Sequence, residues 1–192
     1  MHPRLHLGAS GGPSTSPLDV SRTVVAVVAA LALIAGGLLW ANAPVLPLPA
    51  DAKADLVVVD KAARRLSLYS NGAPIRSYPV SLRRAPVGAK VRDGDHRTPE
   101  GRYLIDRHNP RSSFHLALHV SYPSADDFAR AQAAGYSPGN EIMVHGMRNG
   151  LGWLGRAHLL VDWTSGCVAV TNAEMDQIYP TVSDGTPIEF RP

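Results

Sequence analysis

The sequence contains only one cysteine, Cys167, among its 192 residues. A single cysteine excludes an internal disulfide, so the thiol pairs with another chain, is an inert buried group or takes part in chemistry. Internal repeats and low-complexity tracts are also absent. Charged residues make up only 18% of the chain and apolar residues 45%, which excludes a wholly disordered protein and indicates one folded domain with an extension.

Basic residues are concentrated in the middle of the chain. Residues 53–111 carry 13 basic and 6 acidic side chains and residues 112–192 carry 4 and 8, although the formal net charge is only +3. This division predicts a basic lobe that faces an anionic partner, or a solvated basic face without one. Because the chain begins with an export segment, an envelope polymer or a lipid head group is a better candidate than nucleic acid.

The export segment lies near the N-terminus. No charged residue interrupts residues 23–50, and residues 24–41 form a continuous apolar run. A helix of this length spans a hydrocarbon core of roughly 30 Å. Arg4 and Arg22 precede the run, and the preference for basic residues on the inner side places that end in the cytoplasm.

The end of this segment allows two interpretations. Ala41-Asn42-Ala43 resembles a signal-peptidase site, whereas the run is longer than the core of a typical signal peptide, which favours an uncleaved anchor. The sequence thus predicts a short cytoplasmic N-terminus (1–22), a transmembrane anchor or signal segment (23–43), a proline-bearing linker (44–54) and a periplasmic or otherwise exported domain in the cell envelope (55–192).

The exported part predicts a mainly β domain. Residues 66–70 and 75–81 alternate in polarity around Asn71-Gly72, a pair typical of a tight hairpin turn. Further short strands are expected at residues 55–60, 102–106, 114–121, 142–145, 159–161, 167–170 and 187–190. So many short strands are typical of a sandwich or a barrel.

Two capping boxes predict one or two short helices within this domain. Ser124 precedes Asp127 by three residues, and Gly135 supplies a stop signal for the helix between them. Thr171 precedes Glu174 in the same way and opens a second helix directly after the cysteine segment.

Cys167 has the neighbours that thiol acyl transfer requires. A free thiol is only slightly ionised at neutral pH, and His145, at the end of a predicted strand, is the best-placed base. Gly166 lets its own N–H and that of Cys167 turn towards one point, and each such donor stabilises an oxyanion by about 3–4 kcal/mol. The alternative is that Cys167 takes no part in chemistry and is a small hydrophobic side chain buried in the core.

The sequence resembles the catalytic domain of L,D-transpeptidases (YkuD type). The similar motifs are Thr98-Pro-Glu-Gly101, His145-Gly146 and the segment from Thr164 to Asn172, followed by Ile178-Tyr179. They occur in the expected order within residues 55–191. The resemblance implies an L,D-transpeptidase-like β-sandwich that acts on peptidoglycan stem peptides and requires no metal or organic cofactor.

The resemblance also implies roles for individual residues. Cys167 is the expected nucleophile, which attacks the third residue of a tetrapeptide stem, and His145 is the expected general base. The expected oxyanion hole consists of Ser165, Gly166 and Cys167. The expected substrate-binding residues are Gly146, Arg148, His158 and Thr164.

Two positions depart from the family pattern. Ser165 stands where the family has histidine, and Ala169 stands where it has arginine, the residue suited to bidentate contact with a carboxylate. Arg148 or Arg156 could replace that arginine. The Gly-Cys-x-Ala pattern resembles a YafK-like subgroup, in which water can resolve the thioester, so hydrolysis of stem peptides or of peptidoglycan–protein linkages is the alternative activity.

Two other classes of function compete with a cysteine enzyme. His115 and His119 share one side of a predicted strand and, with His145, could hold a metal for hydrolysis, although no carboxylate follows HExxH-like spacing. A non-catalytic module could instead bind the wall through the basic lobe.

Overall fold

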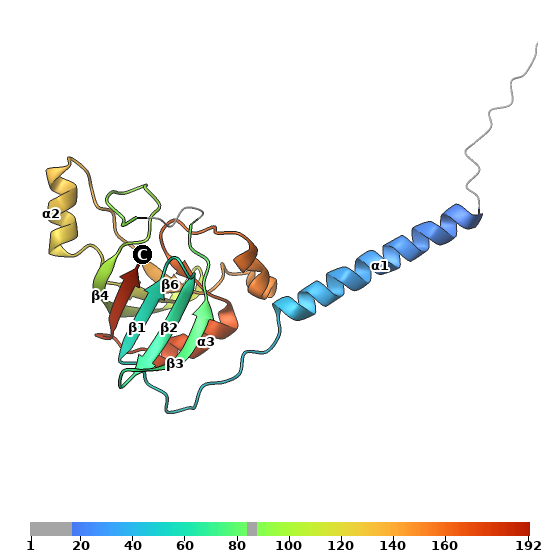
Figure 1. Cartoon of the computed structure of the whole chain (residues 1–192), viewed down its shortest axis with the longest axis horizontal. Helices are drawn as coiled ribbons and strands as arrows, with labels where there is room; N and C mark the ends of the chain where they lie inside the picture. Colours follow the sequence, from blue (N-terminus) through green and yellow to red (C-terminus); the bar gives the residue numbers. More distant parts are fainter. Residues whose placement is uncertain (1–16, 84–87) are drawn as a thin grey trace, which may run out of the picture. The chain divides into compact units, whose positions relative to one another are not determined.

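The computed structural model describes residues 17–83 and 88–192, with side chains from residue 21 onward. Most of the cytoplasmic segment expected at residues 1–22, including Arg4, therefore lies outside the described residues. The chain divides into an N-terminal unit that ends at Leu39 and a larger unit, Trp40–Pro192, which holds every strand of the described residues (Figure 1).

Helix α1 (Pro17–Ala41) covers the apolar run. Its segment Ser21–Ala41 is long and apolar enough to cross a membrane, and its side chains are almost all exposed. A membrane anchor and a signal sequence both fit this length and composition.

The larger unit is mainly β, as the sequence predicted. Its strands are β1 (Leu56–Asp60), β2 (Arg65–Ser70), β3 (Ala73–Pro79), β4 (Gly101–Ser112), β5 (His115–Val120), β6 (Met143–His145), β7 (Val168–Ala169) and β8 (Pro187–Arg191). Its helices are α2 (Ala125–Ala133), α3 (Asn172–Thr181) and a 3₁₀ helix, η1 (Gly152–Leu160). Ser124 and Thr171 cap α2 and α3 through capping boxes, which confirms both predicted helix starts.

The strands form one sheet in the order β3-β2-β1-β8-β4-β5-β6-β7. The long strand β4 pairs with β8 through its first residues and with β5 through its last, so it joins the two halves of the sheet. Beyond β3, Ser81 exchanges backbone hydrogen bonds of 2.9 and 3.0 Å with Ala169 of β7. This bridge links the two outer strands, and the sheet encloses one core.

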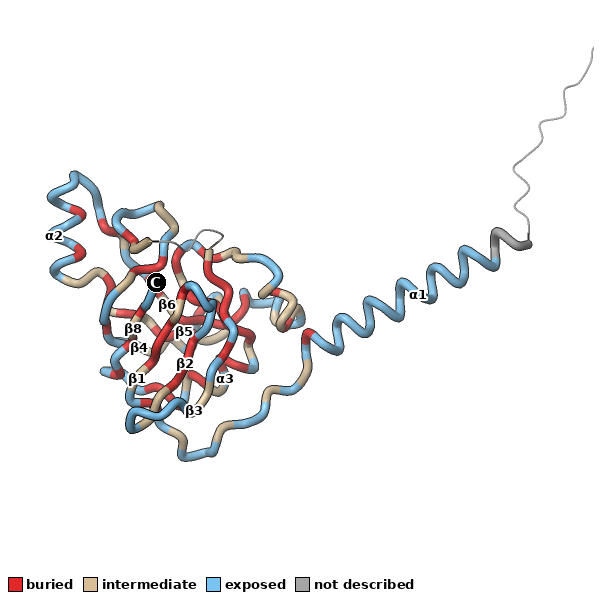
Figure 2. The backbone as a smooth tube through the Cα atoms, viewed as in Figure 1, coloured by how far each residue is buried: buried red, intermediate tan, exposed pale blue. Residues whose placement is uncertain are grey.

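The core is built from the inward side chains of nearly every strand, which Figure 2 shows as red segments of the tube. Its fully buried members include Val59, Leu66, Leu68, Ile105, Val120, Val168, Val170 and Ile188. The linker after α1 also contributes, because Val45 and Leu48 pack against this core. The backbone oxygen of Leu46 accepts hydrogen bonds from Arg76 (3.1 Å) and Gln177 (2.9 Å), so the linker follows the surface of the domain.

The strand predicted at residues 159–161 is wrong. Gly155 has a φ of +47° and kinks η1, and the helix continues through Leu160. The side chains of Leu160 and Val161 are 77% and 52% exposed, so they do not alternate between core and solvent as a strand requires. A local run of apolar residues does not by itself show whether the segment lies next to a hydrophobic core.

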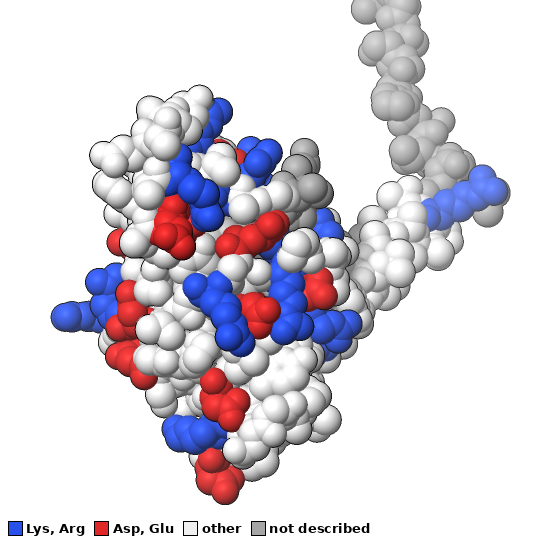
Figure 3. Space-filling model, turned by 60° about the vertical axis from the view of Figure 1, so that its left-hand side comes forward, with Lys and Arg blue, Asp and Glu red and all other residues white. Residues whose placement is uncertain are grey.

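The division into a basic and an acidic lobe is also wrong, because strands from both halves of the chain are neighbours in the sheet. Arg64 pairs with Asp162 at 2.6 Å, and Arg102 lies 3.8 Å from Glu189. On the face drawn in Figure 3, Lys and Arg side chains alternate with Asp and Glu side chains. A wall-binding function based on a basic lobe therefore loses its structural basis.

A buried ion pair anchors the Thr98–Gly101 motif. The Lys61 side chain is 1% exposed, and its ammonium group lies 2.6 Å from the carboxylate of Glu100. The ammonium also donates to the backbone oxygen of Gly88 at 2.9 Å. Because removing one partner leaves an uncompensated buried charge, this pair fixes the segment that precedes β4.

We expect the Glu100→Gln variant to lose about 3 kcal/mol of unfolding free energy, because it leaves the Lys61 charge unpaired. The double variant Lys61→Met, Glu100→Gln should recover part of this loss, since both charges are removed. Chemical denaturation measures both changes. Glu189 provides a control, because it is as exposed as Glu100 (24% and 25%) but its partners Arg102 and Arg191 are exposed, so Glu189→Gln should change stability by less than about 1 kcal/mol. Equal losses in the single and double variants would contradict the buried-charge explanation.

Candidate active site

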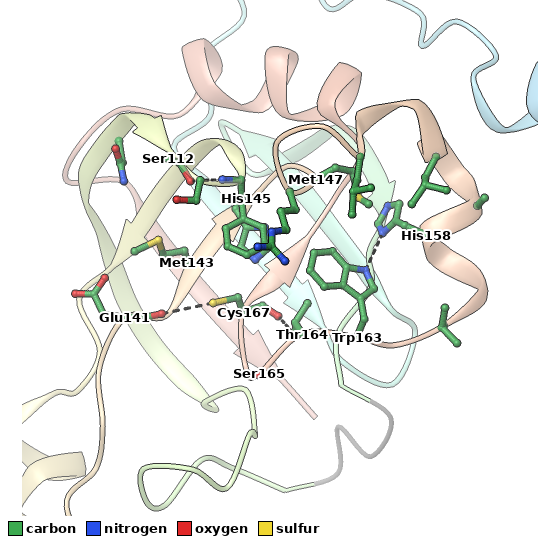
Figure 4. Close-up of a pocket in the computed structure, with 18 residues that line it drawn as sticks. Ser112, Glu141, Met143, His145, Met147, His158, Trp163, Thr164, Ser165 and Cys167 are labelled. Carbon is green, nitrogen blue, oxygen red and sulfur yellow. Dashed lines mark hydrogen bonds between the residues drawn. The ribbon is translucent and has the colours of Figure 1, made fainter.

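The pairing of β6 and β7 brings Cys167 and His145 to one place. The two strands are parallel, with Val144 opposite Val168 and His145 opposite Ala169. Side chains alternate between faces, and Val144 and Val168 point into the core, so Cys167 and His145 share the other face. Diagonal neighbours on paired strands lie roughly 7 Å apart at their backbones, within reach of an imidazole. Both residues line one pocket (Figure 4).

His145 has the form of a neutral base. Its side chain is buried, and its Nδ1 lies 2.7 Å from the backbone oxygen of Gly146. A carbonyl oxygen only accepts hydrogen bonds, so Nδ1 carries the proton and Nε2 keeps a lone pair. Burial lowers the pKa of His145 below its ordinary value, which keeps the ring uncharged at neutral pH.

Cys167 is held as a thiol. Its sulfur lies 3.5 Å from the backbone oxygen of Glu141, to which the thiol donates. Burial raises the pKa of the Cys167 thiol, the N–H of Met143 opposes this rise, and the carboxylate of Glu141 adds to it. The resting pair is therefore a neutral thiol and a neutral imidazole rather than a preformed ion pair.

Thr164 and Gly166 shape the backbone that carries the sulfur. Gly166 has a φ of +119°, and a Cβ there would lie 2.6 Å from the backbone oxygen of Arg97, so only glycine fits. The hydroxyl of Thr164 donates to the backbone oxygen of Cys167 at 2.8 Å and accepts a longer bond, 3.4 Å, from the N–H of Gly166. These bonds assign Thr164 a positioning role, and its predicted contact with substrate remains a prediction.

The predicted oxyanion hole receives unequal support from this geometry. The N–H of Gly166 is already engaged by Thr164. The N–H of Cys167 has no hydrogen-bond acceptor in the described part of the chain and stands beside the sulfur. Ser165 is exposed at the pocket rim. Cys167 is therefore the best-supported donor of the predicted three.

Aromatic side chains enclose the histidine. The ring centroids of Phe114 and His145 are 4.7 Å apart, and Trp163 stacks on Phe114 at 6.1 Å. The ring of Trp163 also lies edge-on to His145, with centroids 5.8 Å apart. Sequence reasoning missed Phe114, because its partners His145 and Trp163 come from segments far along the chain.

His158, a predicted substrate-binding residue, lies in the wall of the same pocket. Its side chain is 3% exposed, and its Nδ1 accepts a long hydrogen bond, 3.4 Å, from the indole N–H of Trp163. Nε2 therefore carries the proton, and it has no hydrogen-bond partner among residues 17–83 and 88–192. Burial, with a smaller contribution from His145, lowers the pKa of His158 to about 4, so this ring is neutral as well.

Gly146 and Asn172 fix the segment after the histidine. The side-chain oxygen of Asn172 accepts a hydrogen bond from the N–H of Met147 at 2.8 Å. A Cβ at Gly146 would approach that same oxygen at 2.8 Å, so glycine allows the first residue of α3 to lie against the His145 segment. The sequence contained Asn172 in its motif but did not indicate this role.

The pocket has a volume of about 900 Å³ and is mostly apolar on the side of η1. Its apolar lining consists of Phe114, Met143, Met147, Leu151, Leu154, Ala157, Val161 and Trp163. Arg148, an expected substrate contact, is exposed at the rim, whereas Arg156 is not among the lining residues. Of the two candidates for the missing arginine, Arg148 is therefore the one at the pocket.

The three histidines of the metal hypothesis do not converge. His115 pairs with Asp176 and His119 pairs with Asp106, each at 2.6 Å, while His145 bonds to its neighbouring backbone. In the described ranges, no group of three His, Cys, Asp or Glu residues is arranged to hold a metal ion. The geometry thus gives this hypothesis no support.

Comparisons with known proteins agree with the geometry. Residues 54–190 match the L,D-transpeptidase catalytic domain family, YkuD. The Escherichia coli (strain K12) protein YafK is 28% identical over 176 residues, covering 83% of this chain and 63% of that protein. The chain thus spans less than two thirds of the curated relative. The crystal structure of the helical cell shape determining protein Pgp2 from Campylobacter jejuni superposes with a TM-score of 0.56 and 22% identity, over 81% of this chain and 54% of that one.

The class of protein follows from these observations: the larger unit is a mainly β catalytic domain with a cysteine and a histidine in one pocket. The family match covers most of the chain, and the chain belongs to the L,D-transpeptidase catalytic domain (YkuD) family. The resemblance inferred from the motifs around Thr98, His145 and Cys167 is confirmed.

Replacing Thr164 with valine should lower the acylation rate of Cys167 by about tenfold or more, because the nucleophile loop loses both bonds that orient it. Thr164→Ser keeps the hydroxyl and should retain most of the rate. Single-turnover acylation with a carbapenem, followed by intact-mass measurement, compares the two variants. Equal rates in both would show that the hydroxyl does not position the sulfur.

The rate of alkylation by iodoacetamide should rise steadily with pH through about 9, because only the thiolate reacts and burial raises the pKa of Cys167. Glu141→Gln removes a negative charge beside the sulfur and should move this curve to lower pH. Asp126→Asn, an exposed residue on α2 away from the pocket, serves as the matched control. A plateau near neutral pH in the unmodified protein would indicate a preformed thiolate and contradict the neutral pair.

Proposed function

We propose that this chain is a cell-envelope enzyme that transfers the acyl group of peptidoglycan stem peptides through a thioester on Cys167. The observation that supports the proposal is that Cys167 and His145, whose Nε2 keeps a lone pair, line one pocket of a domain from the L,D-transpeptidase family. Such a domain serves the synthesis or remodelling of the cell wall.

The reaction follows from the neutral resting pair. When a stem peptide enters, Nε2 of His145 takes the thiol proton as the sulfur attacks the carbonyl of the third residue. The N–H of Cys167 faces the developing oxyanion. The bond to the terminal D-alanine then breaks, and the proton on His145 passes to the departing amine. A thioester on Cys167 remains, and an acceptor must resolve it.

An amine acceptor and water give different products. A side-chain amine of a second stem produces a 3→3 cross-link, whereas water produces a shortened stem or a released protein anchor. Ala169 lies opposite His145 and is fully buried, so its methyl group cannot reach a substrate carboxylate as an arginine could. Arg148 at the rim and the N–H of His158 in the wall are the groups that we assign to substrate binding in its place.

We further infer that α1 remains attached and holds the domain at the outer face of the membrane. Ala41, within the possible cleavage sequence, is 3% exposed, and the following residues continue into the folded unit. A signal peptide that is cleaved off does not have to pack against the folded domain, so the burial of Ala41 favours an uncleaved anchor. Intact-mass measurement of the protein from a membrane fraction tests this directly, because cleavage after Ala43 removes a mass that is easily resolved.

We expect Cys167→Ser and His145→Gln to abolish the covalent adduct with a carbapenem, because the first lacks the nucleophile and the second lacks the base. The same variants should not turn over muropeptides with tetrapeptide stems. Mass spectrometry of the products from the unmodified enzyme distinguishes 3→3 dimers, which indicate transpeptidation, from tripeptides alone, which indicate hydrolysis. Full turnover by Cys167→Ser would refute the cysteine mechanism, and loss of that turnover with a chelator would favour a metal hydrolase.

A further inference from the structure

The 3₁₀ helix η1 and the residue after it expose large apolar side chains. Trp153, Leu160 and Val161 are 59%, 77% and 52% exposed. Isolated apolar side chains are common on protein surfaces, but three within one short segment favour a surface that another body covers. We call these three residues the η1 patch. The catalytic roles assigned above use neither Trp153 nor Leu160.

The chain that follows the apolar helix is packed against the middle of this segment. The side chain of Asn42 donates to the backbone oxygen of Trp153 at 2.9 Å. A Cβ at Gly155 would lie 2.2 Å from the backbone oxygen of Ala41, so the contact exists only because residue 155 is glycine. Gly155, with a φ of +47°, is also the residue at which η1 is kinked. Residues 41 and 42 are therefore integral to the fold of the larger unit.

Ala41 is also the last residue of the segment that can span a membrane. Residues 41 and 42 contact η1 within the larger unit, so a chain that leaves the hydrocarbon core at Ala41 brings η1 close to the lipid head groups. Trp40 is 57% exposed, and tryptophan is the residue most typical of this interface. Arg156 is half-buried on η1 and has no carboxylate partner among the described residues, so it can meet an anionic head group.

We propose that the η1 patch is a lipid-binding surface, which seats the catalytic domain on the outer face of the membrane. This proposal rests on the retained anchor proposed above and not on the cysteine mechanism. The apolar edge of the pocket belongs to the same segment, since Leu151 and Val161 line it. The pocket therefore opens next to the bilayer, and its substrates are stem peptides or peptide linkages close to the membrane, including those of lipid-attached proteins.

The test uses the full chain in vesicles of phosphatidylethanolamine and phosphatidylglycerol. In a Cys167→Ser background, a single new cysteine is introduced by Leu160→Cys and labelled with an environment-sensitive fluorophore. The matched control is Leu104→Cys, because Leu104 on β4 is also an exposed leucine, at 47%. Brominated lipids should quench the label at position 160 about threefold more than the label at position 104, since only the first reaches the interface.

Equal quenching at the two positions, or stronger quenching at position 104, overturns the proposal. A second contrary result is that the label at position 160 is not quenched but shows fluorescence energy transfer between labelled chains. This result overturns the proposal of a lipid-binding surface and indicates a contact between two copies of the chain. A second measurement concerns the substrate: Trp153→Ser with Leu160→Ser should lower turnover of membrane-attached substrate while leaving turnover of soluble muropeptides unchanged. Because quenching requires no catalysis, a failure of the cysteine mechanism would leave the lipid result intact.

Discussion

The site depends above all on the parallel pairing of β6 and β7. This short ladder places Cys167 diagonally across from His145, two residues that come from separate segments of the chain. The bridge between Ala169 and Ser81 holds β7 on its other side, so the nucleophile segment is fixed from two directions. The Gly166 turn precedes β7 and the capped helix α3 follows it, while the aromatic wall packs against the His145 ring.

Burial of the pair determines how it reacts. A thiolate and an imidazolium stabilise each other when they are exposed to water, but removal from water disfavours both charged forms. The pKa of His145 falls and that of Cys167 rises, so the proton stays on the sulfur in the resting site. A neutral thiol is less readily oxidised than a thiolate, so this environment also protects the sulfur.

The segment between the histidine and the cysteine serves two purposes. Its helix η1 lines the apolar side of the pocket and also receives the chain that follows the apolar N-terminal helix. Gly155 makes the second contact possible, and Gly146 makes room for the side chain of Asn172. One stretch of chain thus forms part of the pocket wall and also the contact with residues 41 and 42.

The sequence by itself determined the local features: the hairpin at Asn71-Gly72, both capping boxes and the motifs that mark the family. These follow from interactions within a few residues, which a sequence records directly. Only the tertiary structure decided the neutral state of Cys167 and His145, the burial of His158, the aromatic wall and the mixing of the two charged halves. Each of these depends on burial or on contacts between distant segments. The strand expected at residues 159–161 failed for the same reason, since no core surface lies beneath it.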